Sequence, residues 1–93
     1  MSLKNEKHSQ ELTRVLQKAA KDGVLLEKFL KDLFTPAEYR EIVARWQIVK
    51  ELNHGRSQHE IADELKVGIA TVSRGARVLL NPTGGFNQLL KNP

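Results

Sequence analysis

The sequence predicts an all-α protein that carries a helix-turn-helix. Apolar residues recur three and four positions apart along the chain, and they nowhere alternate with polar residues as they do in strands. Thr35 and Ser57 each stand three positions before a glutamate, which is typical of a capping box that begins a helix. Two short amphipathic segments, residues 57–67 and 68–80, follow one another with only a tight turn between them. Together these patterns favour a helical fold.

Residues 1–34 predict two helices, which we expect to serve dimerisation. The apolar stripe of the first helix ends at the Asp22-Gly23 pair, because such a pair commonly interrupts a helix. The second stripe lies in a helix of roughly ten residues. The stripes consist of Leu12, Val15, Leu16 and Ala19, and of Leu25, Leu26, Phe29, Leu30 and Leu33.

Residues 35–55 predict a central helix. Thr35 is a favourable N-cap, Pro36 fits the first helical position, and Gly55 is the expected stop. Trp46 lies on the apolar side of this helix and is expected in the core. The apolar residues of the helix are Ile42, Val43, Trp46, Val49 and Leu52.

Residues 57–80 predict the helix-turn-helix itself. The small Ala62 allows two helices to cross closely, and Val67 can anchor the turn. Lys66 stands where the turn needs a left-handed backbone, at a cost of about 1 kcal/mol. We expect the two helices to bury Ile61, Ala62 and Leu65, and Ile69, Val72, Ala76 and Leu79. Asn81-Pro82 ends the second helix, and residues 81–93 form either a short closing helix or a frayed tail.

The second of these helices has the outer flank of a DNA reader. Its outward residues are Ala70, Thr71, Ser73 and Arg77, with Arg74 close by. Small groups can touch a thymine methyl, and hydroxyl or guanidinium groups can bind bases and phosphates. The backbone amides at Ser57-Gln58 and at Gly68 begin helices and suit phosphate oxygens. The alternative is an ordinary helical hairpin with a solvated basic face.

Gly75, in the middle of the same helix, needs a separate explanation. A glycine there costs about 1 kcal/mol relative to alanine. The sequence therefore indicates that another group closely approaches the backbone at this position.

Composition narrows the class of protein. The 93 residues suit one domain, 1–93, and the net charge of +4 favours an anionic partner, either nucleic acid or an anionic membrane surface. The absence of cysteine removes disulfides and thiolate metal sites. No segment approaches the roughly 18 apolar residues of a membrane span, and the polar N-terminus has no signal core. We therefore expect a cytoplasmic protein with no membrane partner. The opening Met-Ser-Leu fits either the native chain or a vector remnant.

Two further expectations follow from the residues. The three histidines lack the carboxylates or thiols that would complete a metal site, and no nucleophile has a paired base, so we expect neither a metal site nor an enzyme. Five short helices with apolar stripes also expose more apolar surface than one small domain can hide, which predicts a dimer.

From about Leu33 to Leu80 the chain resembles the tryptophan repressor family. The resemblance is carried by LFTPAE at 33–38, RWQIVKEL at 45–52, Gly55, the Ser57-Gln58 pair with Glu60, and above all the specific octet GIATVSRG at 68–75. It implies an all-helical, intertwined homodimer that represses transcription when L-tryptophan binds as co-repressor.

The resemblance also implies a ligand site. In it, Arg45 and Arg74 sandwich the indole, Arg74 binds the carboxylate, and Gly75 leaves room for the ring. The ammonium is received by the backbone carbonyls of Asp32 and Phe34, with Thr35, from the second subunit. Thr71 lies near the carboxylate, and Ile48 and Val49 add apolar surface. Val78 stands where the family has a serine beside the amino group.

The predicted DNA-binding residues combine those singled out by their own chemistry with the positions that the resemblance implies. They are Gln58, His59, Gly68, Ile69, Ala70, Thr71, Ser73 and Arg77. His59 stands where the family has an arginine that reads guanine.

We therefore predict a sequence-specific DNA-binding repressor gated by L-tryptophan or a related aromatic amino acid, with no other cofactor. One alternative is a helix-turn-helix module that binds DNA without a small-molecule ligand. Another is a helical dimer that binds only protein.

Overall fold

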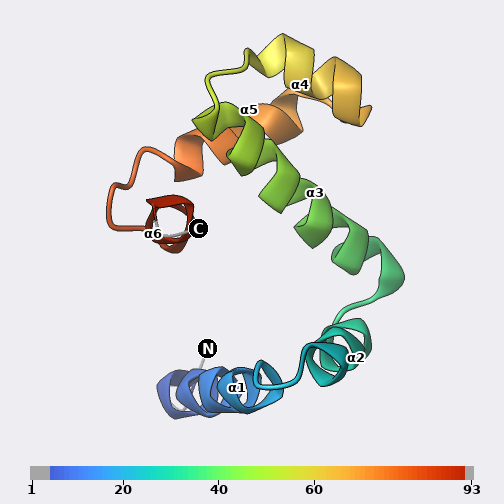
Figure 1. The fold of residues 1–93 in the computed structure, drawn as a ribbon, viewed down its shortest axis with the longest axis vertical. Helices are drawn as coiled ribbons and strands as arrows, with labels where there is room; N and C mark the ends of the chain where they lie inside the picture. The colour runs from blue at the N-terminus through green and yellow to red at the C-terminus, as the bar shows by residue number, and fades with distance from the viewer. Residues whose placement is uncertain (1–4, 92–93) are drawn as a thin grey trace. The chain divides into compact units, whose positions relative to one another are not determined.

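A computed structural model describes residues 5–91, and all regular structure within this range is helical (Figure 1). The helices of this range are α1 (Asn5–Ala19), α2 (Gly23–Leu33), α3 (Pro36–Asn53), α4 (Gln58–Leu65), α5 (Ile69–Val78) and α6 (Gly85–Lys91). The predicted all-α class is confirmed. The chain divides into two compact units, one up to Tyr39 and one from Arg40 onward. Residues 1–3, whose origin the sequence leaves open, lie outside the described range.

The first unit buries little of its apolar surface. Ala19 is buried at the end of α1, but no residue of α2 is buried. Removal of apolar surface from water stabilises a fold. The apolar faces of α1 and α2 therefore contribute little stability unless another surface covers them. The large apolar residues left exposed in this unit are Leu12, Val15, Val24, Leu25 and Leu33.

Asp22 begins α2 instead of ending α1. The backbone N–H groups of Val24 and Leu25 donate to Oδ1 of Asp22 at 3.0 and 3.4 Å. An aspartate at this position satisfies helix donors that have no partner inside the helix. Because α1 already ends at Ala19, the predicted end of the first helix at Asp22-Gly23 is misplaced.

Both predicted boundaries of α3 agree with the structure. The N–H of Glu38 donates to Oγ1 of Thr35 at 3.2 Å, and the N–H of Thr35 donates to Oε1 of Glu38 at 2.9 Å. This reciprocal pair is the predicted capping box. After Asn53 the chain turns at Gly55, whose φ of 85° lies in the left-handed region that glycine enters without steric cost.

The core of the second unit joins three helices. Ile48 and Val49 of α3, Ile61 of α4 and Val72 of α5 are fully buried, at 0% exposure. Ile48, Ile61 and Val72 form one buried cluster with Ala62, which the sequence predicts at a close helix crossing. The partly buried side chains that pack against it are Leu52, Leu65 and Val67. This small core holds α4 and α5 on α3. Figure 1 shows the three helices.

Ile69 does not join this core. It is 42% exposed, whereas its place in the apolar pattern of residues 68–80 predicts a buried side chain. Ile69 is the first residue of α5, and Val67 in the preceding turn packs on the core in its place. The helix also ends earlier than predicted, at Val78 instead of at Asn81-Pro82.

The tail forms a closing helix, α6, which resolves the open alternative for residues 85–91. Phe86 of α6 packs against Trp46 of α3, with ring centroids 6.2 Å apart. The Asn87 amide donates to the carbonyls of Leu79 and Asn81 at 3.0 and 2.7 Å, so α6 is attached to the end of α5. Trp46 is half-buried, and not fully in the core.

Candidate nucleic-acid interface

The turn between α4 and α5 fixes the direction of α5. Lys66 has φ 57° and ψ 45°, the left-handed conformation that the sequence predicts at this position. The N–H of Lys66 and the N–H of Val67 both donate to the carbonyl of Ala62, the latter at 3.1 Å. These bonds satisfy donors at the end of α4 and so offset part of the cost of a left-handed lysine.

The start of α4 is equally well defined. The N–H of Glu60 donates to Oγ of Ser57 at 3.1 Å, and the N–H of Ser57 donates to Oε1 of Glu60 at 3.3 Å. The hydroxyl and backbone of Ser57 lower the pKa of the Glu60 carboxyl below its ordinary value. The second predicted capping box is therefore present, and it places Gln58 and His59 in the first turn of α4.

Most residues predicted to meet DNA are accessible on this helix pair. Val72 holds α5 on the core, while Thr71 and Ser73 are half-buried beside it. The exposed members of the predicted set are His59, Gly68, Ile69, Ala70 and Arg77. Whether they bind DNA stays a prediction at this point.

Two residues of the predicted DNA face are bound to each other. Oγ of Ser73 donates to Oε1 of Gln58 at 2.7 Å, and both side chains are partly buried. The bond links the first turn of α4 with the middle of α5. It reduces the freedom of both side chains.

Arg56, a residue that belongs to none of the sequence motifs, links α4 to α3 through ion pairs. Its Nη1 binds Oε1 of Glu51 at 2.9 Å and also binds Oε2 of Glu64, while Nη2 lies 4.0 Å from Oε2 of Glu60. The hydrogen bond from Arg56 is the main cause that lowers the pKa of the Glu51 carboxyl. Nδ1 of His54 lies 3.4 Å from Oε2, the other carboxylate oxygen of Glu51.

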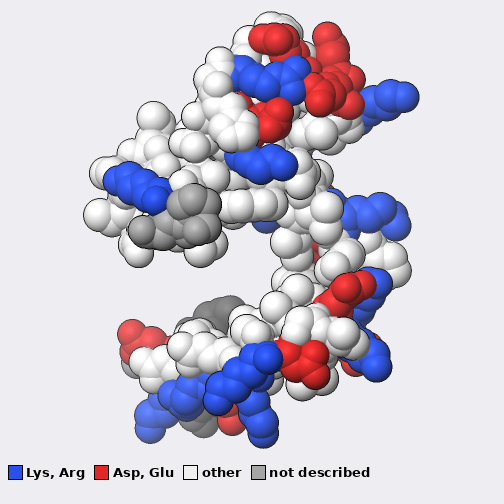
Figure 2. Space-filling model, in the orientation of Figure 1, with Lys and Arg blue, Asp and Glu red and all other residues white. Residues whose placement is uncertain are grey.

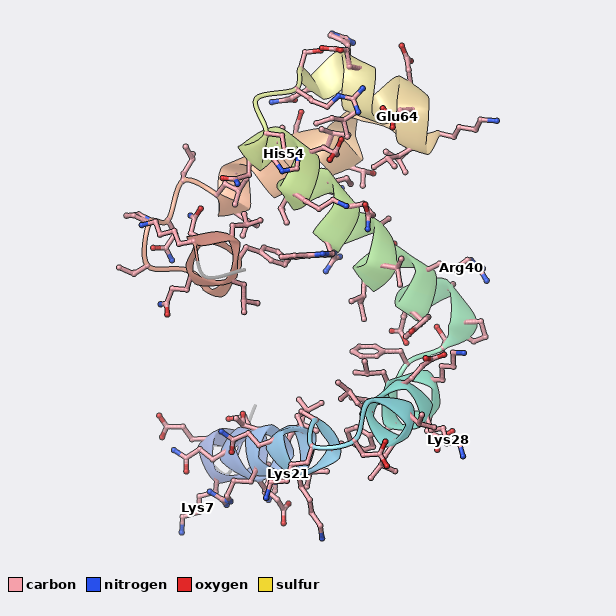
Figure 3. The ribbon with its side chains drawn as sticks, in the orientation of Figure 1. Lys7, Lys21, Lys28, Arg40, His54 and Glu64 are labelled. Carbon is pink, nitrogen blue, oxygen red and sulfur yellow. The ribbon has the colours of Figure 1, made fainter. Side chains whose placement is uncertain are left out.

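The resulting charge cluster surrounds the α3–α4 connection. Figure 3 shows His54 at the end of α3 and Glu64 on α4, and Figure 2 shows acidic and basic side chains gathered over this region. In the sequence, Arg56 directly follows Gly55, which indicates a turn and does not predict ion pairs for its neighbour. The paired glutamates lie five positions before Arg56 and eight positions after it, and spacings other than the three or four of a helix do not by themselves predict an ion pair.

The residues predicted to hold a ligand differ in accessibility. The side chain of Arg45 is 62% exposed and lies 3.9 Å from Glu41, a distance that leaves the guanidinium weakly held. Arg74 is exposed, and Val78 is 49% exposed. Thr71 is half-buried. These side chains are accessible to a ligand from outside the core.

Gly75, Ile48 and Val49 have another function in the structure. A Cβ added at Gly75 would lie 2.8 Å from Cγ2 of Ile48 and 3.7 Å from Cγ1 of Val49. Gly75 therefore allows α5 to pack directly on α3, which is the close approach that its presence in a helix indicates. The reason drawn from the resemblance, room for a ring, is not needed to explain the glycine. Contact of these three residues with a ligand stays a prediction.

The predicted ammonium acceptors lie where α2 ends. Asp32 is in the last turn of α2, and the residue four positions on is Pro36, which has no N–H to donate to its carbonyl. Phe34 is the C-cap of α2 and is half-buried. The hydroxyl of Thr35 already accepts the hydrogen bond from Glu38, which limits what else it can accept.

Comparison with known proteins decides the family. A family model described as "Trp repressor protein" matches residues 7–93. The chain belongs to the Trp repressor family. Among its relatives, a "Trp operon repressor homolog" of Photobacterium profundum is 42% identical over 74 residues, which cover 75% of this chain and 68% of the relative. A protein of the same name from Chlamydia trachomatis serovar L2 is 34% identical over 70 residues, or 70% of this chain and 74% of that protein. A third, from Vibrio cholerae, is 48% identical over 54 residues, or 57% and 52%.

Membership in the Trp repressor family sets the general class of function. The family is one of transcriptional repressors, which are regulatory DNA-binding proteins and not enzymes. The resemblance stated from the sequence motifs and the expectation of a non-enzyme are confirmed. Among residues 5–91 of this Trp repressor family member, no helix has the length and apolarity to cross a membrane. The same range contains no group of three acidic, histidine or cysteine side chains placed to hold a metal ion.

Proposed function

We propose that this chain represses transcription by binding a specific operator DNA through α4 and α5, with L-tryptophan as its co-repressor. The observation that carries the DNA-binding part is the geometry of the helix pair. A left-handed Lys66 and a buried Val72 hold α5 so that Ala70 and Arg77 remain exposed. A recognition helix needs this combination, because its inner side must be fixed while its outer side enters the major groove.

The proposed protein is an intertwined homodimer. The support lies in the first unit, where α2 has no buried residue and large apolar side chains are exposed on α1 and α2. A second copy of the chain would cover these surfaces and place two recognition helices on a near-palindromic site, about 34 Å apart. An obligate dimer should melt at a temperature that rises with protein concentration. A concentration-independent melt together with a monomer mass in sedimentation would contradict the dimer.

The proposed tryptophan site combines residues of both subunits. Arg74 would bind the ligand carboxylate, and Arg45 and Arg74 would stack on the indole. The carbonyls of Asp32 and Phe34, with Thr35, would receive the ammonium from the second subunit. Thr71, Ile48, Val49, Gly75 and Val78 would line the remainder of the site.

Burial suggests how such a ligand would control the protein. Ile48 is fully buried beneath Gly75, so a ligand that contacts Ile48 requires α5 to move relative to α3. A ligand shifts a conformational equilibrium only if it binds one arrangement more tightly than the other. If tryptophan binds only the arrangement in which α5 is displaced, it has a higher affinity for that arrangement. The displacement would also change the direction in which α5 meets DNA.

One experiment tests the function as a whole. Duplexes would be selected from a random library by the full chain with L-tryptophan present, and the affinity for the selected duplex would then be measured with and without the amino acid. Heat of tryptophan binding would be measured by calorimetry on the same protein. We expect a selected sequence, affinity that falls steeply with salt, and tighter DNA binding with tryptophan. Such a repressor acts where DNA is, so the cytoplasm remains its predicted location.

The rival functions give different results. Equal DNA affinity with and without millimolar tryptophan, and no heat of binding, would support the helix-turn-helix module without a ligand. The absence of salt-dependent affinity for any duplex would support a helical dimer that binds only protein.

A further inference from the structure

Arg56 is fixed to the end of α3 by its backbone and by its side chain. Its N–H donates to the carbonyl of Glu51 at 3.2 Å, and the N–H of Gly55 donates to the carbonyl of Leu52 at 3.0 Å. These two bonds form the C-terminal cap of α3. Nη1 of Arg56 also donates to Oε1 of Glu51 at 2.9 Å. Any movement of α4 relative to α3 therefore leaves Arg56 with α3.

The guanidinium of Arg56 also reaches the far end of α4. Nη1 binds Oε2 of Glu64, the last residue but one of α4, while Glu60 lies 4.0 Å from Nη2. Only Ser57 separates Arg56 from the start of α4. The ion pair between Arg56 and Glu64 therefore spans the junction of the two helices. It forms only at an angle between α3 and α4 that brings Glu64 back to Arg56.

α4 and α5 are joined to each other independently of this ion pair. Ile61 of α4 and Val72 of α5 are buried in the same cluster, and the turn of residues 66–68 leaves little free chain between the helices. Oγ of Ser73 on α5 donates to Oε1 of Gln58 on α4 at 2.7 Å. A displacement of α5 relative to α3 therefore carries α4 with it and moves Glu64 away from its place beside Arg56.

We propose that the ion pair between Arg56 and Glu64 is a latch, which holds α4 and α5 where Gly75 packs on Ile48 and so opposes tryptophan binding. The proposal rests on the proposed function, in which tryptophan displaces α5 from α3 and the displaced arrangement binds DNA more tightly. Because the ion pair breaks on displacement, it favours the ligand-free arrangement. Arg56 and Glu64 are thus positioning residues, which act without contacting tryptophan or DNA.

Exposure limits the strength of the latch. The side chain of Arg56 is 31% exposed and that of Glu64 is 56% exposed, and ion pairs open to water are weak. We therefore expect loss of the latch to change affinities by about two- to five-fold. Where the latched arrangement predominates, the latch weakens tryptophan binding and tryptophan-free DNA binding by the same factor. It does not affect DNA binding at saturating tryptophan, because the latch is then open.

Glu64→Gln breaks the latch with little change in side-chain size. Asp63→Asn is the matched control, because Asp63 is exposed on the same helix, loses the same charge and forms no ion pair within residues 5–91. Calorimetry on the full chain would give the affinity of each variant for L-tryptophan. The affinity for the duplex selected from the random library would be measured without tryptophan and at saturating tryptophan.

Compared with Asp63→Asn, Glu64→Gln should bind L-tryptophan about two- to five-fold more tightly. It should bind the duplex more tightly by the same factor when tryptophan is absent. At saturating tryptophan the two variants should bind the duplex equally, so the gain in DNA affinity that tryptophan produces should be smaller in Glu64→Gln.

Two more variants separate the latch from a general role in stability. Arg56→Gln removes the other half of the ion pair, so its affinity for tryptophan should rise at least as much, and the addition of Glu64→Gln should give no further gain. Asp22→Ala removes the N-cap of α2 and should lower the melting temperature without a gain in tryptophan affinity. A residue that served stability alone would behave as Asp22 does.

Equal tryptophan affinity in Glu64→Gln and Asp63→Asn would overturn the latch. Weaker binding in Glu64→Gln would also overturn it, because the ion pair would then favour the ligand-binding arrangement. If the wild-type chain gives no heat with L-tryptophan, the tryptophan part of the proposed function fails and the inference falls with it. If the wild-type chain binds tryptophan and its duplex while the two variants do not differ, only the inference is wrong.

Discussion

Gly75 in α5 lies so close to Ile48 in α3 that a Cβ on the glycine would be 2.8 Å from Cγ2 of Ile48. Cγ2 is attached directly to the Cβ of Ile48, and the side chain is fully buried, so it cannot move aside easily. The glycine is therefore what allows α5 to pack on α3. This contact joins the two elements on which both DNA binding and ligand binding are proposed to depend.

The first prediction concerns this contact. Gly75→Ala should gain about 1 kcal/mol of helix propensity but cost about 1–3 kcal/mol through overpacking against Ile48. We expect a net loss in the free energy of unfolding of about 1 kcal/mol, measured by chemical denaturation.

A double variant gives the control. Ile48→Leu removes the methyl group on Cβ that the new alanine would meet, so Gly75→Ala in that background should be nearly neutral or stabilising. If Gly75→Ala stabilises the wild-type chain as much as it stabilises the Ile48→Leu chain, the packing explanation is wrong. A larger residue at Gly75 would disturb this packing as well as any ligand, so it cannot test the ligand site alone.

Local chemistry explains why much of this fold could be predicted. The capping boxes at Thr35 and Ser57 and the left-handed turn at Lys66 depend on residues within a few positions of one another, and the structure contains all three. Asp22 shows the limit of such rules. The same residue type can follow one helix or begin the next, and the sequence alone does not decide which.

Features that join distant segments could not be predicted in the same way. The cluster of Arg56 depends on the angle between α3 and α4, and the bond from Ser73 to Gln58 spans 15 positions. Gly75 shows an intermediate case. Its place in a helix predicts a close approach, but only the structure shows that the approaching group is Ile48.

The second prediction is that the Arg56 cluster gives the protein stability that is lost in acid. Arg56 lowers the pKa of the Glu51 carboxyl, chiefly through the hydrogen bond between them. A lowered pKa contributes stability that is fully present above the ordinary glutamate pKa of about 4.3. This contribution to stability is lost as the pH falls from about 4.3 through the lowered pKa of Glu51. We therefore expect the melting temperature of the wild-type chain to fall below about pH 4.3.

The Arg56→Gln variant isolates that contribution. It should melt at a lower temperature than the wild type at pH 7, and the difference should shrink as the pH falls below about 4.3. Arg40→Gln, at an exposed position of α3, is the matched loss of one positive charge and should change the melt little. A difference between Arg56→Gln and wild type that is the same at pH 7 and pH 3 would contradict the assignment.

The third prediction uses Trp46 as a reporter of α6. Trp46 is the only tryptophan of the chain, and Phe86 lies 6.2 Å from it between ring centroids. Phe86→Ala should shift the emission of Trp46 to longer wavelength, because water reaches the indole, and should cost about 1–2 kcal/mol in stability. Phe86→Leu keeps apolar cover and should show a smaller shift. Unchanged emission in Phe86→Ala would mean that α6 does not rest on Trp46 in solution.

The fourth prediction tests the carboxylate partner of the proposed ligand. Arg74 is exposed, so Arg74→Ala should leave the fold intact. It should weaken tryptophan binding by on the order of 2–4 kcal/mol, since a charged carboxylate loses its guanidinium partner. Calorimetry measures the loss directly. An Arg74→Ala protein that binds tryptophan as the wild type does would place the carboxylate elsewhere.

The last prediction concerns Val78, which is 49% exposed near the end of α5. A valine offers no acceptor to the ligand ammonium, so in the proposed site that group depends on the carbonyls of Asp32 and Phe34 and on Thr35 from the second subunit. Indole propionate, which lacks the amino group, should therefore compete well with tryptophan in the wild-type protein. Val78→Ser supplies a hydroxyl that can accept from the ammonium, and a hydrogen bond to a charged group is worth about 1.5–3 kcal/mol. We expect the preference for tryptophan over indole propionate to rise by on the order of ten-fold in this variant.

Val78→Ala, which changes the size without adding an acceptor, should leave the preference near the wild-type value. An equal gain in both variants would show that space, and not the hydroxyl, limits the site, and no gain in either would place the ammonium away from Val78.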